Sequence, residues 1–346
     1  MAEEAKKAEL SIEEVLASTS IADVYQAAKQ LDGVAAKTHL IESPYFSDLC
    51  GNNVYLKPEN LQNTGSFKLR GAYNKISQLN EDERKRGVIT ASAGNHAQGV
   101  AFAARALNCK AVICMPATTP ILKVEATRAY GAEVVLYGDS FDDAYAKSLE
   151  LQKKKGYVYI HPFNDQKVLA GQGTTALEII DELKDVDAIL VPIGGGGFAS
   201  GVALATKAVN PNVKVIGVEP EGAPCMEKSF MEGHITTLSA VDTVADGCAV
   251  KTPGDLTYAF CKKYLDQIIT VSEMEIMSAL LSLIEKHKLI AEGAGALSLA
   301  ALNKLPFKGK KVAAIISGGN IDISTISALI DKALIARGRV FCFSVQ

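Results

Sequence analysis

Short apolar runs alternate with longer stretches of helical spacing from about residue 50 onward. The runs cover residues 54–56, 88–90, 111–114, 133–136, 157–160, 188–191, 213–218 and 312–316. Most are continuously apolar, as expected of parallel strands that are covered on both faces, while stretches such as 140–154 and 166–183 repeat with the period of a helix. This alternation predicts an α/β fold with right-handed crossovers between parallel strands.

Composition narrows the class of protein. The chain has 346 residues, of which 48% are hydrophobic, and this length suggests two domains. No linker rich in proline, glycine or serine separates them, so we expect one domain to be inserted in the other. A formal net charge of -3 without a basic block argues against nucleic acid as a partner. No apolar run is long enough to cross a membrane, so no membrane partner is expected either.

The cysteines and the N-terminus indicate a compartment. Seven cysteines occur without a CxxC pair, so neither a disulfide framework nor a zinc site is expected. The N-terminus is charged from Glu3 onward and lacks the apolar core of a signal peptide. We therefore expect a cytoplasmic protein with reduced thiols.

A lysine stands at the start of one expected helix. Residues 63–66 form a polar turn that could cap a helix over 67–79, which places Lys68 in the first turn beside Phe67. The positive end of the helix dipole disfavours the charged amine, and a neutral amine is what a Schiff base requires. Considered alone, Lys68 is better interpreted as a solvated helix lysine, because most lysines are exposed.

Four consecutive glycines follow the run at 188–191 and precede a helical stretch. They are Gly194, Gly195, Gly196 and Gly197. Without side chains, their backbone N–H groups can converge on one anion at a helix N-terminus, although a loose loop is the alternative interpretation. Neither a Walker motif nor GxGxxG with a ribose-binding acid is present. A reactive amine and a phosphate cradle in one chain predict pyridoxal 5′-phosphate (PLP) as the cofactor.

Two further loops follow expected strands. Ser92-Ala93-Gly94-Asn95-His96 comes after the strand at 88–91, and its N–H groups could bind the carboxylate of an amino acid. His96 could be a base, but the physics of the sequence favours a packed or capping role. Ser317-Gly318-Gly319-Asn320 comes after the strand at 312–316. Ligands gather at the carboxyl ends of strands in open α/β sheets, so we expect these loops and Lys68 to form one site.

These four motifs, in this order, resemble the fold-type II PLP enzymes, whose fold is tryptophan synthase β-like. Within them the chain looks like the threonine dehydratase (threonine ammonia-lyase) and serine racemase branch, over about residues 20–336. The resemblance implies two open, twisted, mostly parallel-sheet domains, with a small substrate-loop domain at 85–160 inserted in a large PLP-binding domain at 1–84 and 161–336. The tail at 337–346 resembles the start of an ACT-like regulatory domain.

The resemblance also implies a role for each motif residue. Lys68 would carry PLP as a Schiff base, Phe67 would pack beside its ring, Asn95 would bind its 3′-oxygen, and Ser317 would face its pyridine nitrogen. The PLP phosphate would be held by Gly194, Gly195, Gly196 and Gly197. The substrate carboxylate would be bound by the loop of Ser92, Ala93, Gly94, Asn95 and His96.

The implied reaction is β-elimination of L-threonine, and also of L-serine, to a 2-oxo acid and ammonia. It would serve amino-acid catabolism or isoleucine biosynthesis in a homodimer or homotetramer. The Ser317 hydroxyl cannot hold a pyridinium proton as an aspartate can, which favours loss of a leaving group over transamination.

Two alternatives remain open: a serine or aspartate racemase, and a catalytically silent PLP-binding protein. Racemases that resemble this chain carry a second serine where it has Ala93, and a methyl group cannot exchange a proton. Their divalent-cation site uses an acid like Glu219 and another six residues later, where this chain has Cys225. Because a thiol suits Mg²⁺ or Ca²⁺ poorly, no metal is expected. The complete set of motif residues argues against a silent protein.

Overall fold

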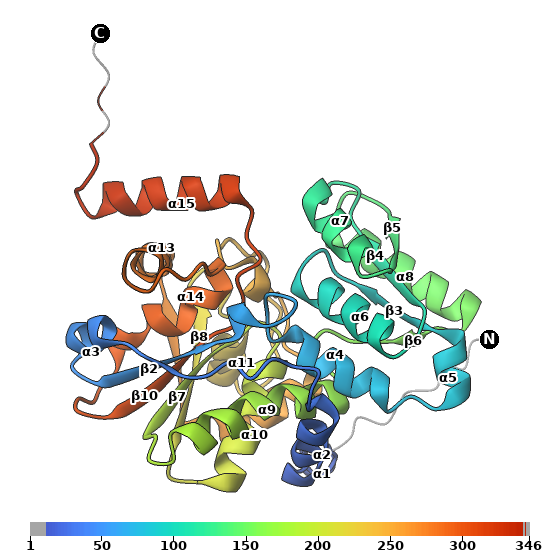
Figure 1. Cartoon of the computed structure of the whole chain (residues 1–346), viewed down its shortest axis with the longest axis horizontal. Helices are drawn as coiled ribbons and strands as arrows, with labels where there is room; N and C mark the ends of the chain where they lie inside the picture. The colour runs from blue at the N-terminus through green and yellow to red at the C-terminus, as the bar shows by residue number, and fades with distance from the viewer. Residues whose placement is uncertain (1–11, 342, 344–346) are drawn as a thin grey trace.

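The computed structural model of the chain describes residues 12–341 and 343 and contains two β-sheets flanked by helices (Figure 1). In the larger sheet the strand order is β1-β2-β10-β7-β8-β9. Its strands are β1 (Ile41–Glu42), β2 (Asn53–Pro58), β7 (Ala188–Pro192), β8 (Lys214–Pro220), β9 (Gln267–Val271) and β10 (Lys311–Ile316). β1 is antiparallel to β2, and the other neighbours are parallel. The carboxyl ends of β2, β10 and β7 therefore meet at one edge.

The smaller sheet is parallel throughout and has the order β5-β4-β3-β6. Its strands are β3 (Val88–Ala91), β4 (Ala111–Met115), β5 (Glu133–Leu136) and β6 (Val158–Tyr159). All four lie between β2 and β7 in the chain. The α/β class and the predicted strands are confirmed; β1 and β9 were not predicted. The domain boundaries proposed at 84/85 and 160/161 remain a prediction.

Helices cover both faces of the larger sheet. One face packs against α3 (Pro44–Cys50), α13 (Glu273–Ser282), α14 (Gly293–Ala300) and α15 (Ile323–Ala336), and the other against α2 (Ile21–Leu31), α9 (Gln166–Glu182), α10 (Gly197–Val209) and α12 (Asp255–Tyr264). In β7, Leu190 belongs to the first core, whereas Ile189 and Val191 belong to the second. The strand runs are continuously apolar because neither face meets water.

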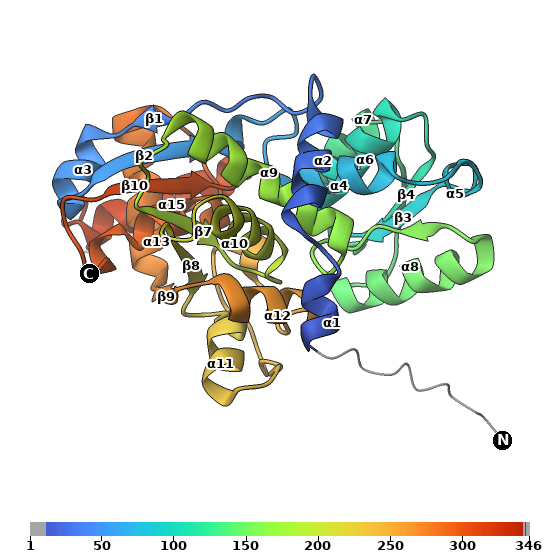
Figure 2. The same ribbon diagram turned by 90° about the horizontal axis from the view of Figure 1, so that it is seen from below.

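The smaller sheet is covered in the same way, by α6 (Asn95–Ala106) and α7 (Ile121–Ala129) on one face and by α8 (Phe141–Lys155) on the other. Helix α4 (Lys68–Ser77) packs against both α6 and α9, so it lies between the two sheets, as Figure 2 also shows. The remaining helices are α1 (Ile12–Ala17), α5 (Glu81–Arg86), α11 (Cys225–Glu232), the 3₁₀ turns at Glu59–Leu61, Asp246–Cys248 and Leu302–Lys304, and a π-helical turn at Leu283–His287.

Beyond α15, the described residues 337–341 and 343 form no strand. The rest of the expected ACT-like segment, 342 and 344–346, lies outside the described residues. Within the described ranges, no helix has the length and apolar character needed to span a membrane.

Candidate active site

A cavity of about 870 Å³ lies where the loops that follow strands of both sheets come together. Every predicted site residue lines it: Phe67, Lys68, Ser92, Ala93, Gly94, Asn95, His96, Gly194, Gly195, Gly196, Gly197 and Ser317. The loops follow β3, β7 and β10, and parallel pairing places the last two ends side by side. The convergence predicted from the strand ends is therefore present.

The start of α4 is fixed by the loop after β10. The Phe67 N–H donates to the Ser317 carbonyl at 3.1 Å, and Ser66 forms an isolated antiparallel bridge with Gly318. The predicted side-chain cap from residues 63–66 is wrong: Phe67 takes the N-cap position without a side-chain bond. The Ser66 hydroxyl is buried and has no partner in the described part of the chain. Backbone pairing, rather than capping, holds Lys68 next to Ser317.

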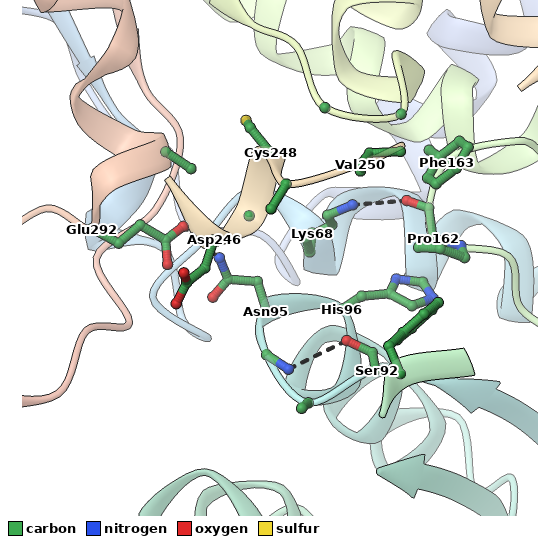
Figure 3. Close-up of a pocket in the computed structure, with 18 of the residues that line it drawn as sticks. Lys68, Ser92, Asn95, His96, Pro162, Phe163, Asp246, Cys248, Val250 and Glu292 are labelled. Atoms are coloured by element: carbon green, nitrogen blue, oxygen red, sulfur yellow. Dashed lines mark hydrogen bonds between the residues drawn. The ribbon is translucent and has the colours of Figure 1, made fainter. Parts of the chain in front are cut away.

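The Lys68 amine donates to the carbonyl of Pro162 at 2.8 Å (Figure 3). Burial lowers the pKa of Lys68 to about 8, while Cys248 and Glu292 act in the opposite direction. Among the described residues no carboxylate forms an ion pair with this amine. A neutral amine is therefore accessible near neutral pH, as predicted, and its main cause is burial rather than the helix dipole.

The four glycines form a packed turn rather than a loose loop. Gly196 has φ +90°, a conformation that favours glycine, and α10 begins at the next residue. A Cβ on Gly195 would lie 2.3 Å from the ring of Phe163, so no side chain fits there. The Thr257 hydroxyl donates to the Gly195 carbonyl at 2.6 Å.

The N–H groups of this turn remain available. No acceptor within the described residues takes the N–H of Gly194, Gly195 or Gly196. Orphan donors at a helix N-terminus fit a phosphate group. Together with an amine that is readily neutral in the same cavity, they fit PLP.

The loop after β10 is connected to the smaller sheet through Asn95. The Asn95 amide donates to Glu292 at 2.6 Å and accepts from the Asn320 amide at 2.7 Å. The Ser317 hydroxyl is buried and donates to the Ala294 carbonyl at 3.2 Å. Asn95 thus joins the turn after β3 to the N-terminus of α14, across the cavity.

His96 is held as a packed residue. Its Nε2 donates to the Ile160 carbonyl at 2.9 Å, and the ring is buried. Burial lowers its pKa to about 3, and the Lys68 charge acts in the same direction. A ring that is neutral and already bonded fits the packed role favoured from the sequence. The methyl group of Ala93 lines the cavity nearby.

Sequence reasoning missed part of the lining, notably Glu292, Asp246, Cys248 and residues 161–163 of the turn after β6. Burial raises the pKa of Glu292 to about 7 and of the Cys248 thiol far above its usual range. Glu292 and Asp246 lie in segments without a recognisable motif. The turn at 161–164 follows β6, so its place at a strand end was a signal that could have been used.

Glu219, the acid that resembles a cation ligand of the racemases, is buried and hydrogen-bonded within the protein. Both carboxylate oxygens of Glu219 accept backbone N–H groups, from Met226 at 2.9 Å and Glu227 at 2.8 Å. Burial raises the pKa of Glu219 to about 8. In the described part of the chain, no group of three histidine, cysteine or acidic side chains could hold a metal ion.

Known proteins resemble this chain over most of its length. An L-threonine ammonia-lyase of Thermotoga maritima is 52% identical over 321 residues, covering 92% of this chain and 80% of that protein. The processed form of threonine deaminase isoform 2 from Solanum lycopersicum superposes with a TM-score of 0.89 at 43% identity, covering 94% and 90% of the two chains. A serine racemase from Dictyostelium discoideum gives a TM-score of 0.84 at 38% identity, covering 88% and 100%.

The match to a protein family is equally extensive. Residues 31–318 match the family described as "Pyridoxal-phosphate dependent enzyme", which is more than half of the chain. The resemblance in the motifs, the family match and the similar structures therefore agree. This chain belongs to the pyridoxal-phosphate-dependent enzymes, with the fold of the fold-type II group.

Proposed function

We propose that the protein is a threonine ammonia-lyase that removes the β-hydroxyl of L-threonine, and also of L-serine, as water and releases ammonia when the resulting enamine takes up water again, to leave 2-oxobutyrate or pyruvate. The observation that carries this proposal is the pairing, in one cavity, of the Lys68 amine with the orphan N–H groups of the glycine turn. The Thermotoga maritima ammonia-lyase, at 52% identity, supports the choice of reaction.

The residues that would hold PLP lie on the larger sheet and at the start of α6. Lys68 would bind its aldehyde carbon, Gly194, Gly195, Gly196 and Gly197 its phosphate, Phe67 one edge of the ring, Asn95 its 3′-oxygen and Ser317 the region of its pyridine nitrogen. PLP, when bound, withdraws electrons from the substrate Cα and makes its proton acidic.

The chain's own groups then supply proton transfer and orientation. The Lys68 amine, once free, takes the proton from Cα, and its depressed pKa keeps enough of it unprotonated for this task. The loop at 92–96 would bind the substrate carboxylate through N–H groups other than that of Ser92, which donates to the Cys114 carbonyl at 3.1 Å. The β-hydroxyl leaves as water, and hydrolysis of the released enamine gives the 2-oxo acid and ammonia.

Ala93 separates this reaction from racemisation. Racemisation needs a proton donor on the face of Cα opposite Lys68, and the methyl group that lines the cavity at Ala93 has none to give. A chiral assay of unreacted serine tests the choice. D-serine that accumulates faster than pyruvate would favour the racemase.

The decisive experiment is a 2-oxo acid assay with L-threonine on the wild type, Lys68→Ala and Lys85→Ala. Lys85 is an exposed lysine on α5 and serves as the matched control. We expect Lys68→Ala to lose essentially all turnover and Lys85→Ala to retain it. Near wild-type turnover by Lys68→Ala would refute the assignment. A panel of β-hydroxy amino acids, with products identified by mass, tests the catalytically silent alternative, which would be supported if none of them gave an oxo acid.

We also propose a cytoplasmic homodimer or homotetramer, built through the large domain formed by 1–84 and 161–336. Buried free cysteines such as Cys50, Cys114 and Cys261 support a reducing compartment. Sedimentation at micromolar concentration tests the assembly. A single species of 36.7 kDa would contradict it.

A further inference from the structure

The turn His161-Pro162-Phe163-Asn164 has no role in the mechanism above, yet it borders the cofactor lysine and the glycine turn. The Pro162 carbonyl accepts from Lys68, and the Phe163 ring lies against Gly195. The Asn164 amide donates to Asp255 at 2.6 Å. Contacts with Lys68, Gly195 and Asp255 therefore hold this turn in place.

The first residue of the turn is a histidine with a defined tautomer. Its Nδ1 accepts two backbone N–H groups, from Asn164 at 2.8 Å and from Phe163 at 3.2 Å. A ring nitrogen that accepts a hydrogen bond carries no proton, so the proton of the neutral ring is on Nε2. The ring also packs edge-to-face with Phe163, with centroids 4.7 Å apart, which restrains its orientation.

The other ring nitrogen is unoccupied. His161 lines the cavity, and its Nε2 has no hydrogen-bond partner within residues 12–341 and 343. Burial lowers the pKa of the ring to about 4; Lys68 acts in the same direction, and Asp165 and Asp255 act in the opposite one. At neutral pH the cavity is therefore bordered by a fixed N–H donor rather than by a base.

We propose that the Nε2–H of His161 donates a hydrogen bond to the β-hydroxyl oxygen of the amino-acid substrate. This inference rests on the proposed function. In the proposed function the loop at 92–96 binds the substrate carboxylate and the cofactor holds the amino group, which leaves the β-oxygen as the polar atom without a partner. Negative charge grows on this oxygen as the C–O bond breaks, and a donor held in place stabilises that charge.

Two substitutions separate the two nitrogens of the ring. In His161→Asn the side-chain oxygen can occupy the position of Nδ1, so the turn keeps its acceptor and the cavity loses its donor. In His161→Gln the amide nitrogen can reach the position of Nε2, so the cavity keeps its donor and the turn loses its acceptor. If His161 only stabilises the turn, His161→Gln should be the less active of the two variants. If His161 binds substrate, His161→Asn should be the less active.

The measurements are kcat/KM for L-threonine, the inhibition constant of L-2-aminobutyrate, which lacks the β-hydroxyl, and the melting temperature of each holoenzyme. We expect His161→Asn to lower kcat/KM by about 10- to 100-fold, the range for loss of one donor to a developing charge. Its inhibition constant for L-2-aminobutyrate should stay within about twofold, and its melting temperature should be unchanged. His161→Gln should keep most of kcat/KM but melt earlier, because the turn loses two hydrogen bonds.

Two outcomes with His161→Asn would overturn the proposal. If His161→Asn keeps wild-type kcat/KM, or if threonine and L-2-aminobutyrate weaken equally, His161 does not bind the β-oxygen. Should His161→Gln fail to fold, the comparison of the two ligands on His161→Asn still decides. A wild type without any 2-oxobutyrate production would refute the proposed function itself, and so the two failures are distinguishable.

Discussion

The cavity has one wall on each sheet, and the two walls are packed differently. The large-sheet wall consists of Lys68, Gly194–197 and Ser317, and the small-sheet wall of residues 92–96. A Cβ on Gly195 would meet Phe163 at 2.3 Å, whereas a Cβ on Gly94 would meet nothing within 4 Å. The backbone at Gly195, in the wall proposed to hold the cofactor, is closely packed, while the backbone at Gly94, in the wall proposed to hold the substrate, has space around it.

The two walls also differ in the burial of the arginine on the helix behind each of them. Behind Lys68, the fully buried Arg70 donates from Nε to Glu59 at 2.8 Å and from Nη1 to Glu178 at 2.6 Å. Behind the small-sheet wall, Arg105 on α6 is exposed and reaches the Ala129 carbonyl at 3.3 Å. The helices α4 and α6, which begin at Lys68 and Asn95, thus each carry an arginine, but only that of α4 is buried with its partners.

The largest expected effect is on the stability of the large-sheet wall. Arg70→Ala leaves the buried Glu59 carboxylate without its partner, and breaking a buried pair in this way costs about 3–5 kcal/mol. Arg105→Ala is the matched control and should cost less than about 1 kcal/mol, as exposed pairs do. Denaturant unfolding of the two holoenzymes measures both values. Equal losses would mean that the two walls do not differ in this respect.

The second prediction concerns the glycines. Gly195→Ala must displace the Phe163 ring, and overpacking of this kind costs about 1–3 kcal/mol. Because the ring and the glycine turn move apart, PLP content should fall as well. Gly94→Ala adds the same methyl group in open space and should keep both stability and PLP content. Absorbance of PLP and melting temperature report the two quantities, and a Gly195→Ala protein that retains full PLP would contradict the proposed cradle.

Much of this architecture could be predicted because each signal was local. Strands such as β3, β7 and β10 are short apolar runs, and their ends carry the motif loops. β1 has two residues and carries too little pattern to be recognised. β9 contains a β-branched run at Ile268–Val271, but it is an edge strand of which part is exposed, and the prediction omitted it.

The site was predictable only where a motif marked it. Lys68 and the glycines stand out in the sequence, and the structure brings them into one cavity. Glu292 and Cys248 reach the same cavity through the packing of α14 and a 3₁₀ turn, which no local pattern encodes. The cap expected at 63–66 failed for the same reason: pairing of Ser66 with Gly318 depends on residues 252 positions away in the chain.

A third prediction tests the bond from His96 to Ile160, which joins the small-sheet wall to the end of β6. The pKa of His96 is about 3 in the folded protein, against about 6.5 when unfolded. Between these values the unfolded chain binds a proton that the folded protein does not, so stability falls as pH decreases through this window. His96→Gln retains an N–H donor to Ile160 but does not titrate.

When the pH is lowered from 8 to 5, the wild type should therefore lose about 2 kcal/mol more unfolding free energy than His96→Gln does. Denaturant unfolding at both pH values measures this difference. His39→Gln removes an exposed histidine and serves as the control. Parallel curves for His96→Gln and wild type would show that the ring is not held neutral, and the small-sheet wall would then lack this anchor.

The smallest effect is expected from Ala93→Ser, which changes the chemistry of the small-sheet wall without changing its packing. Ala93 lines the cavity, and in the proposed reaction the added hydroxyl would supply a proton donor on the side of Cα opposite Lys68. Racemisation of serine should rise, but the variant should remain a competent lyase. A serine hydroxyl is a weak acid, and even a well-matched acid or base contributes only about 10²–10⁴-fold. Solvent deuterium at Cα and D-serine formation measure the change. If the variant makes no more D-serine than the parent while its lyase activity persists, the choice of reaction depends on how the substrate is positioned between the two walls, and not on the residue at 93.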